Sequence, residues 1–216
     1  MAAMTKPAAL MTKMATEPSI SPKAAQILGA AKGAFVRDGY EPTSMDTVAK
    51  EAGVSKATLY AHFTSKENLF AAVVARECQR HVETLERIEQ AKLPVAEALE
   101  QIGMGFLNFL LMPDVIAVHN MVIGAANRFP ALGKAFYEAG PTKVHALISE
   151  FLARATERGE LAIPDPEIAA ELFLAMMKGH AQLRSELGFG APSEAEKMRT
   201  VKAGVTLFVR GYAPHS

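Results

Sequence analysis

VAKEAGVSKATLYAHF, residues 48–63, has the layout of two short helices joined by a tight turn. Ala49 and Gly53 lie four residues apart, so they share one face of the first helix, and their small size lets the second helix cross close by. Gly53 also suits the left-handed backbone conformation that ends a helix sharply. We expect Leu59 and Phe63 to point inward and anchor the second helix. The pattern predicts a helix-turn-helix.

The outward face of the second predicted helix carries small, hydroxyl and basic side chains. Such a face near a helix N-terminus suits the major groove of DNA, where side chains must reach base edges without steric conflict. The alternative is an ordinary surface helix, since many helical proteins expose a lysine and a tyrosine. The outward residues are Ser55, Lys56, Ala57, Thr58, Tyr60 and Ala61.

Prolines and glycines divide the rest of the chain into helix-sized pieces, with almost no alternating strand pattern. The helix before the quoted stretch begins with Ser21 as N-cap and Pro22 at the first helical position. These signals predict an all-α protein of nine or ten helices. The expected segments are residues 21–39, 43–53, 55–63, 65–90, 94–111, 113–127, 131–158 with a break at Gly140-Pro141, 166–187 and 193–212.

A longer stretch, TSMDTVAKEAGVSKATLYAHFTSKENLF (residues 43–70), resembles the DNA-binding domain of TetR-type transcriptional regulators, in a match that covers residues 27–74. RFPALGKAFYEAGP, and ERGEL with DPEIAAELF, are similar to the AefR-like group of C-terminal domains. The resemblance implies a three-helix DNA-binding head and a helical C-terminal body for ligand binding and dimerisation. The expected divisions are a flexible arm at 1–20, the head at 21–66 and the body at 67–216.

The resemblance also implies roles for individual residues of the head. Helix N-termini and lysines are the phosphate ligands that physical chemistry favours. Ala57 stands where the family often has glycine, and its methyl group can touch a thymine methyl. Glu41 and Asp46 would repel phosphate and keep non-specific affinity modest. The implied contacts are phosphate at Thr43, Ser44 and Lys66, bases at Ser55, Lys56, Ala57 and Thr58, and the opposite backbone at Tyr60 and His62.

The chain is electrically balanced as a whole, with 23 basic and 23 acidic residues and a pI near 7. Residues 1–66 hold eight of the basic and five of the acidic residues, which leaves 15 and 18 for the remainder. The front of the chain is therefore positive by three charges and the rest negative by three. This asymmetry indicates a small anion-binding module joined to a slightly acidic body.

The single cysteine, Cys78, excludes an intramolecular disulfide and a cysteine-rich metal site, which fits a reducing cytosol. No apolar run approaches the roughly 18 residues of a membrane span. Residues 1–20 have no continuous apolar core, so no secretory signal is expected there. We therefore expect a cytoplasmic protein without a membrane partner.

The C-terminal body mixes aromatic and methionine side chains with polar ones, as the walls of an apolar ligand pocket do. The alternative is that these residues form the ordinary core. No histidine or acidic cluster has metal-ligand spacing and no nucleophile–base motif occurs, so no metal, cofactor or catalytic residue is expected. The ligand-pocket candidates are Phe106, Phe109, Met112, His119, Met121, Phe136, His145, Met176, Met177 and His180.

Two apolar stripes near the C-terminus, in residues 168–187 and 198–212, indicate a contact between two copies of the chain. Ala175 and Gly179 are small enough to let helices approach closely, and one head alone would read too few base pairs. The alternative is that both stripes seal the core of one copy. The dimer-interface candidates are Leu172, Ala175, Met176, Gly179, Leu183, Val201, Val205 and Phe208.

These features favour a homodimeric repressor that binds a pseudo-palindromic operator in double-stranded DNA. A small, largely apolar effector in the body would shift the helix at residues 65–90 and change the separation of the two heads. One alternative is a TetR-like activator or other regulator without an effector. Another is a helical small-molecule-binding protein or enzyme with a vestigial head.

Overall fold

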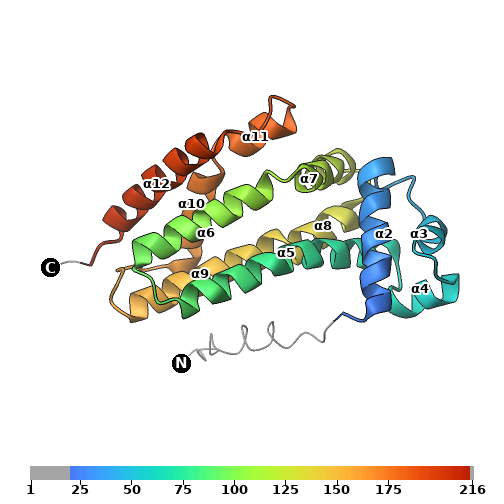
Figure 1. Cartoon of the computed structure of the whole chain (residues 1–216), viewed down its shortest axis with the longest axis horizontal. Coiled ribbons are helices and arrows are strands. Elements are labelled where there is room, and N and C mark those ends of the chain that lie inside the picture. The colour runs from blue at the N-terminus through green and yellow to red at the C-terminus, as the bar shows by residue number, and fades with distance from the viewer. Residues whose placement is uncertain (1–19, 215–216) are drawn as a thin grey trace.

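The computed structural model describes residues 20–214, except for the side chains of residues 80–86, 89 and 90. Within that range the chain is helical and contains no strand, which confirms the all-α prediction (Figure 1). The helices are α2 (Pro22–Asp38), α3 (Met45–Glu51), α4 (Lys56–His62), α5 (Lys66–Gln90), α6 (Val95–Leu110), α7 (Pro113–Ala125), α8 (Pro130–Ala139), α9 (Pro141–Glu157), α10 (Pro166–Lys178), α11 (Ala181–Glu186) and α12 (Glu194–Gly211).

Helices α2, α3 and α4 form the head at one end of the molecule (Figure 1). Ile27 and Phe35 of α2, Val48 of α3 and Leu59 of α4 fill its centre, and each is no more than 1% exposed. Burial of a side chain of this size is worth roughly 1.5–3 kcal/mol. The predicted inward position of Leu59 is confirmed. Helix α4 is too short to be stable by itself in water, so its packing against the rest of the head stabilises it.

Serine caps start all three helices of the head. Ser21, Ser44 and Ser55 each accept a hydrogen bond through Oγ from the backbone N–H three residues further on, at 3.0–3.1 Å. Each cap satisfies a donor that the helix itself cannot use. Gly53, between α3 and α4, has a φ of 61°, the left-handed value that the sequence predicts.

The long helix α5 runs from the head along the body, where it packs against α6, α8 and α9 (Figure 1). Two apolar clusters fill the molecule. One joins the head to α5, α7 and α8 and includes Phe35 and Phe70. The other lies among α6, α9, α10 and α12 and includes Phe151 and Phe173. Because the head shares its core with α5, a displacement of α5 reaches the head.

Residues 166–187 form two helices, although the sequence pattern predicts one. Gly179 has a φ of 45°, a left-handed value at which an α-helix cannot continue, and α10 ends just before it. The next helix, α11, begins at Ala181 and packs against α7 (Figure 1). The sequence pattern does not reveal this break because apolar residues keep helical spacing on both sides of Gly179.

No single helix in residues 20–214 is long and apolar enough to cross a membrane. The pair α6 and α7 passes on length and composition together, but the two helices are bent by 65° at their junction. Six residues of α6 are buried among the neighbouring helices.

Met177 of α10 fills the space between α6 and α12 and is fully buried. Two glycines make room for it. A Cβ atom on Gly103 of α6 would lie 2.6 Å from Met177 Sδ, and one on Gly204 of α12 would lie still closer to the Met177 methyl group. The expectation that Met177 lines a ligand pocket is therefore wrong, because these helices enclose its side chain.

Gly103→Ala should destabilise the protein by about 1–3 kcal/mol, because the added methyl group overpacks a filled core. Gly105→Ala is the matched control on the same helix, since a Cβ atom there meets nothing within 4 Å. It should leave stability unchanged or raise it by up to about 1 kcal/mol. Urea unfolding followed by circular dichroism measures both variants. Equal midpoints would contradict the close contact at Met177.

Candidate nucleic-acid interface and ligand cavity

One face of α4 is open to solvent, while the other packs into the head. Leu59 and Phe63 turn inward and are 0% and 7% exposed, whereas Tyr60 is 42% exposed. Thr58 is half-buried at the edge of the open face. The exposed residues of this face are Ser55, Lys56, Ala57, Tyr60, Ala61 and His62.

Hydroxyl pairs lie at the starts of α3 and α4. Ser44 Oγ lies 2.9 Å from Thr47 Oγ1, and Ser55 Oγ lies 2.8 Å from Thr58 Oγ1. Because a hydroxyl group can donate and accept at once, each pair keeps capacity for a phosphate oxygen. Both helix starts therefore have the chemistry expected of a DNA contact.

Lys56 has a partner of its own at the start of α4. Its Nζ lies 2.8 Å from Asp46 Oδ1 of α3, and the hydrogen bond to this carboxylate raises the pKa of Lys56. The two side chains are 62% and 64% exposed, so solvent weakens the pair. Asp46 is thus partly neutralised, and DNA must compete with it for Lys56.

Thr43 has a structural role that the sequence did not indicate. Its side chain is 2% exposed, and Oγ1 donates to the Gly39 carbonyl at 2.7 Å, with the Ala34 carbonyl at 3.3 Å. These contacts tie the loop before α3 to the end of α2. The Thr43 hydroxyl is therefore not available to phosphate, which corrects the expectation, and the neighbouring Ser44 is the exposed cap.

Lys66, at the start of α5, is held against the loop between α2 and α3. Its Nζ donates to the carbonyls of Thr43 at 2.8 Å and Glu41 at 3.1 Å, and it lies 4.3 Å from the centre of the Tyr40 ring. Burial lowers the pKa of Lys66. An ammonium group has three N–H donors, so one remains for a phosphate oxygen. The phosphate contact of Lys66 stays a prediction.

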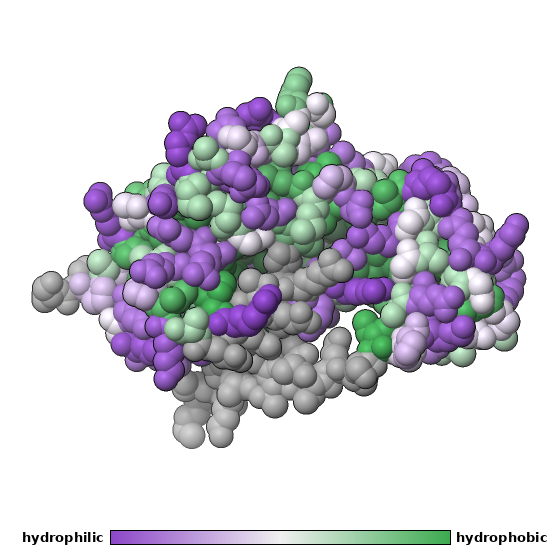
Figure 2. Space-filling view, in the orientation of Figure 1, coloured by the Kyte–Doolittle hydropathy of each residue, from purple (hydrophilic) through white to green (hydrophobic). Residues whose placement is uncertain are grey.

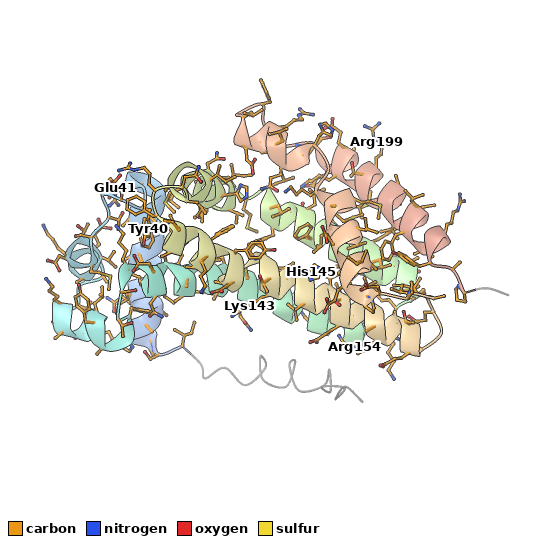
Figure 3. The ribbon with its side chains drawn as sticks, turned by 180° about the vertical axis from the view of Figure 1, so that it is seen from behind. Tyr40, Glu41, Lys143, His145, Arg154 and Arg199 are labelled. Carbon is orange, nitrogen blue, oxygen red and sulfur yellow. The ribbon has the colours of Figure 1, made fainter. Side chains whose placement is uncertain are left out.

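Tyr40 lies where the head meets the body (Figure 3). Its ring centre is 5.8 Å from that of Phe70 in α5 and 5.8 Å from that of Phe129, just before α8. Its hydroxyl donates to Glu67 Oε1 at 2.9 Å, and burial raises the pKa of Tyr40. The tyrosine therefore connects the head to α5 and to the start of α8.

Ion pairs also cross from the head to the body. Lys32 Nζ of α2 lies 3.1 Å from Glu77 Oε2 of α5 and 2.9 Å from Asp114 Oδ2 of α7. Burial lowers the pKa of Lys32, but the hydrogen bonds to Asp114 and Glu77 outweigh it and raise the pKa overall. A second pair joins Arg128 to Glu41 at 2.9 Å. These bridges hold the head against α5 and the α7–α8 region.

A cavity of about 220 Å³ lies in the body, with walls from α5, α6, α7, α8, α9, α10 and α11. Its lining is mostly apolar and includes the rings of Phe106, Phe109 and Phe136. Lys32 from α2 of the head also reaches it, beside Asp114. A cavity of this composition suits a small apolar or aromatic molecule.

Helix α5 forms one wall of the cavity through Val73, Val74, Glu77 and Cys78. Burial raises the pKa of the Cys78 thiol to about 11, so this thiol stays protonated near neutral pH. Phe70, about one turn earlier on the same helix, lies in the core shared with the head. An occupant of the cavity would therefore touch the helix that supports the head.

An exposed apolar surface covers α10, α11 and α12. Leu172 is 49% and Leu183 is 52% exposed, and Ala175 and Gly179 are also exposed. Figure 2 shows a hydrophobic residue at the tip of the loop between α11 and α12. The other exposed apolar side chains of this surface are Ile168, Leu187, Phe189, Met198 and Leu207.

Family models match both parts of the chain. Residues 97–214 match the AefR-like transcriptional repressor C-terminal domain, and residues 27–73 match the tetR family of bacterial regulatory proteins. The chain belongs to the TetR family. This family consists of DNA-binding transcriptional regulators and not of enzymes.

Curated relatives resemble shorter segments of this TetR-family chain. The HTH-type transcriptional activator FasR of Mycolicibacterium smegmatis is 50% identical over 60 residues, which are 28% of this chain and 26% of FasR. The HTH-type transcriptional regulator UidR of Escherichia coli is 37% identical over 71 residues, which are 33% of this chain and 35% of UidR. The chain thus matches only a minor part of each of these relatives.

Solved structures are similar over both the head and the body. A protein described as a TetR-family transcriptional regulator from Mesorhizobium loti is 30% identical, with a TM-score of 0.77, over 91% of this chain and 100% of that chain. The Flavonoid-responsive Regulator FrrA is 34% identical, with a TM-score of 0.72, over 90% of this chain and 98% of that chain.

Four of the ten ligand-pocket candidates line the cavity of this TetR-family protein, namely Phe106, Phe109, His119 and Phe136. The sequence did not identify the wall from α5, because nothing local distinguishes a cavity-facing valine from a core valine. It also did not identify Gln182, which reaches the cavity only because the chain breaks at Gly179. Among the described residues, no group of His, Cys, Asp or Glu could hold a metal ion.

The remaining six candidates lie outside the cavity. Met112 and His180 are exposed. Met121, Met176 and Met177 pack against or within the apolar clusters. His145 of α9, labelled in Figure 3, has its Nε2 2.9 Å from the Glu167 carbonyl oxygen in α10.

The apolar stripe on α12, the last helix of this TetR-family protein, packs into the core of the same copy of the chain. Val201, Val205 and Phe208 are at most 3% exposed and pack in the cluster of α6, α9, α10 and α12. The expectation that they form a dimer interface is wrong, because this side of α12 faces α6 and α10. Met176 is partly buried against the same cluster. Helical spacing shows that a face is covered, but not by which partner.

Asp46→Asn should strengthen non-specific DNA binding, because it frees Lys56 and removes a negative charge beside it. One further phosphate contact steepens the slope of log affinity against log salt by about 0.9. Fluorescence anisotropy with a labelled duplex of unrelated sequence, over a salt series, measures this slope. Glu138→Gln is the control, since it removes the exposed acidic partner of Lys134 in the body. An equally steep slope in both variants would assign the effect to net charge alone.

Proposed function

We propose that this TetR-family protein is a homodimeric repressor, and that a small, largely apolar effector in the cavity releases it from a pseudo-palindromic operator. One observation carries the proposal. The cavity is bounded by α5, which holds part of the core of the head, and by Lys32 of α2. An occupant that displaces either helix therefore moves the DNA-binding face.

The head supplies the proposed DNA contacts. The exposed face of α4 enters the major groove with its small N-terminal residues closest to the bases. The cap at the start of α3 and the free donor at the start of α5 meet phosphate oxygens. In these roles we place Ser55, Lys56, Ala57 and Thr58 at the bases, Tyr60 and His62 at the opposite backbone, and Ser44 and Lys66 at phosphates.

A second copy of the chain supplies the second head. Helix-turn-helix dimers bind two half-sites about 34–36 Å apart, one helical turn of DNA. The exposed apolar surface on α10, α11 and α12 is the proposed contact, in which the same patch on each copy meets the other. Burial of Leu172 and Leu183, with Ala175 and Gly179 between them, would remove this surface from water.

The repressor role and the effector class have separate support. The family model that matches residues 97–214 is described as an AefR-like transcriptional repressor domain. FrrA, which is similar over nearly its whole length, is named for its response to flavonoids, which are polycyclic aromatic compounds. The phenylalanine-lined wall of the cavity has the chemistry for an aromatic molecule, and its volume of about 220 Å³ favours a small one.

Release of DNA requires that the effector distinguish two arrangements of the head. A ligand shifts an equilibrium only by its differential affinity for the two states. The cavity provides such a difference if the arrangement that binds the effector best holds the two heads at a spacing that does not match the operator. Contacts from α5 and from Lys32 to the occupant would provide this coupling.

A second candidate function is transcriptional activation. FasR, which is 50% identical over a 60-residue segment, is named as an activator. The DNA-binding face described for the head would be the same in both cases. A reporter gene under the bound promoter distinguishes them, since deletion of the regulator raises expression for a repressor and lowers it for an activator.

Tyr60→Ala should weaken operator binding about tenfold, because it removes an exposed hydrogen-bonding side chain from the DNA face. Fluorescence anisotropy with the DNA that flanks the gene, over a salt series, measures the affinity and the number of chains bound. Tyr137→Ala on α8 is the matched control, since this tyrosine is 65% exposed and lies in the body. An affinity independent of salt, or equal losses in both variants, would contradict the proposed interface.

Lys32→Met should weaken operator binding by a few-fold while the fold is kept. The variant retains most of the apolar stem but loses both ion pairs that orient the head, so a smaller fraction of molecules has the correct head spacing. Lys23→Met is the control on the same helix, because Lys23 is exposed and, among the described residues, its side chain bonds with Gln26 alone. If both variants lose affinity equally, the loss reflects charge rather than orientation.

A further inference from the structure

One end of the cavity differs from the rest of its wall. His119 of α7 and Gln182 of α11 lie together there, and the His119 ring centre is 5.9 Å from that of Phe136. Gln182 is only 4% exposed, although its side chain is polar. A buried amide in an apolar wall is costly unless its hydrogen-bonding atoms find partners.

Glu186 fixes both side chains from one position. Its Oε1 lies 2.7 Å from His119 Nδ1 and accepts a hydrogen bond from Gln182 Nε2 at 2.5 Å. Gln182 and Glu186 are four residues apart on α11, so they share a face of that helix. A carboxylate oxygen only accepts, so His119 Nδ1 carries a hydrogen and the Gln182 amide directs its nitrogen toward Glu186.

This arrangement leaves two acceptor atoms. Gln182 Oε1 receives no hydrogen bond from any residue that the structure describes. With one hydrogen on the ring, at Nδ1, His119 Nε2 has a lone pair, and its neighbour is Gln182 Nε2 at 3.5 Å, a long and weak contact for the second hydrogen of that amide. Gln182 and His119 therefore present acceptors to an occupant, and the cavity wall also includes the exposed Lys178 of α10, whose ammonium group is a donor.

We infer that the effector is an aromatic molecule with a hydroxyl group, and that this hydroxyl donates to the acceptor pair of Gln182 Oε1 and His119 Nε2. The inference rests on the proposed effector role of the cavity. The phenylalanine rings of the wall pack against the aromatic frame, and Glu186 keeps the two acceptors in place. A carboxylate at this acceptor pair would meet Glu186 and two acceptors, so only Lys178 of α10, which also lines the cavity, would attract it.

A matched set of probes tests the inference: naphthalene, 2-naphthol and 2-naphthoic acid, with flavone and 7-hydroxyflavone as a larger pair. Their affinities for the full-length protein are measured by equilibrium dialysis. In each pair the hydroxylated compound should bind about tenfold more tightly, the effect of one buried hydrogen bond. The ratio within a pair is the readout, because it cancels the contribution of the aromatic frame.

Two variants assign the preference to the acceptor pair. His119→Phe and Gln182→Met should each bring the ratio toward one while binding of naphthalene and flavone is kept. His180→Phe is the control, since His180 is exposed and does not line the cavity, and it should keep the tenfold ratio. If Gln182→Met fails to fold, His119→Phe carries the test, because its ring keeps the volume of the wall.

Several results would overturn the inference: equal binding within both pairs, an unchanged ratio in His119→Phe, tightest binding of 2-naphthoic acid, or no binding of any probe. Operator binding is measured in parallel, with and without each compound. Loss of the proposed function would appear as absence of salt-dependent operator binding, whatever the hydroxyl preference. Release of the operator by a compound that shows no hydroxyl preference would reject the inference alone.

Discussion

Phe70 on α5 is the contact through which the head and the body share one core. It is fully buried, with its ring centre 5.4 Å from that of Phe35 in an edge-to-face pair and 5.8 Å from that of Tyr40. Aromatic pairs of this geometry add about 0.5–1.5 kcal/mol beyond burial itself. Tyr40 in turn meets Phe129 at 5.8 Å. The head therefore has no apolar core separate from α5, and its orientation follows that helix.

The cavity lies on the next turns of the same helix, so the ligand site and the support of the head are physically continuous. Val73 and Val74 line it directly, and Glu77 pairs there with Lys32 of the head. Gln182 at the other end of the cavity lies on α11, and α11 carries part of the exposed apolar surface of α10, α11 and α12. An occupant would thus contact both the support of the DNA-binding face and the neighbourhood of the proposed dimer contact.

Local signals in the sequence predicted local structure well, and tertiary choices poorly. The serine caps and the left-handed Gly53 were predictable because each depends on residues within one turn. Thr43 and Ser44 have similar cap chemistry, and only packing of the complete head decides that the first is buried. Likewise, the spacing of residues 201–208 shows a covered face without naming what covers it, and Gln182 joins the cavity through a bend that no periodicity records.

The pair between Lys56 and Asp46 gives the regulator an internal substitute for DNA phosphate. Any stretch of DNA offers phosphates, so on random sequence Lys56 exchanges one anion for another and gains little. Under the proposed function, the same exchange on the operator would be accompanied by base contacts that the internal carboxylate cannot imitate. The consequence would concern target search: the protein would leave unrelated sequence sooner, and less of it would be held on the rest of the chromosome at any moment.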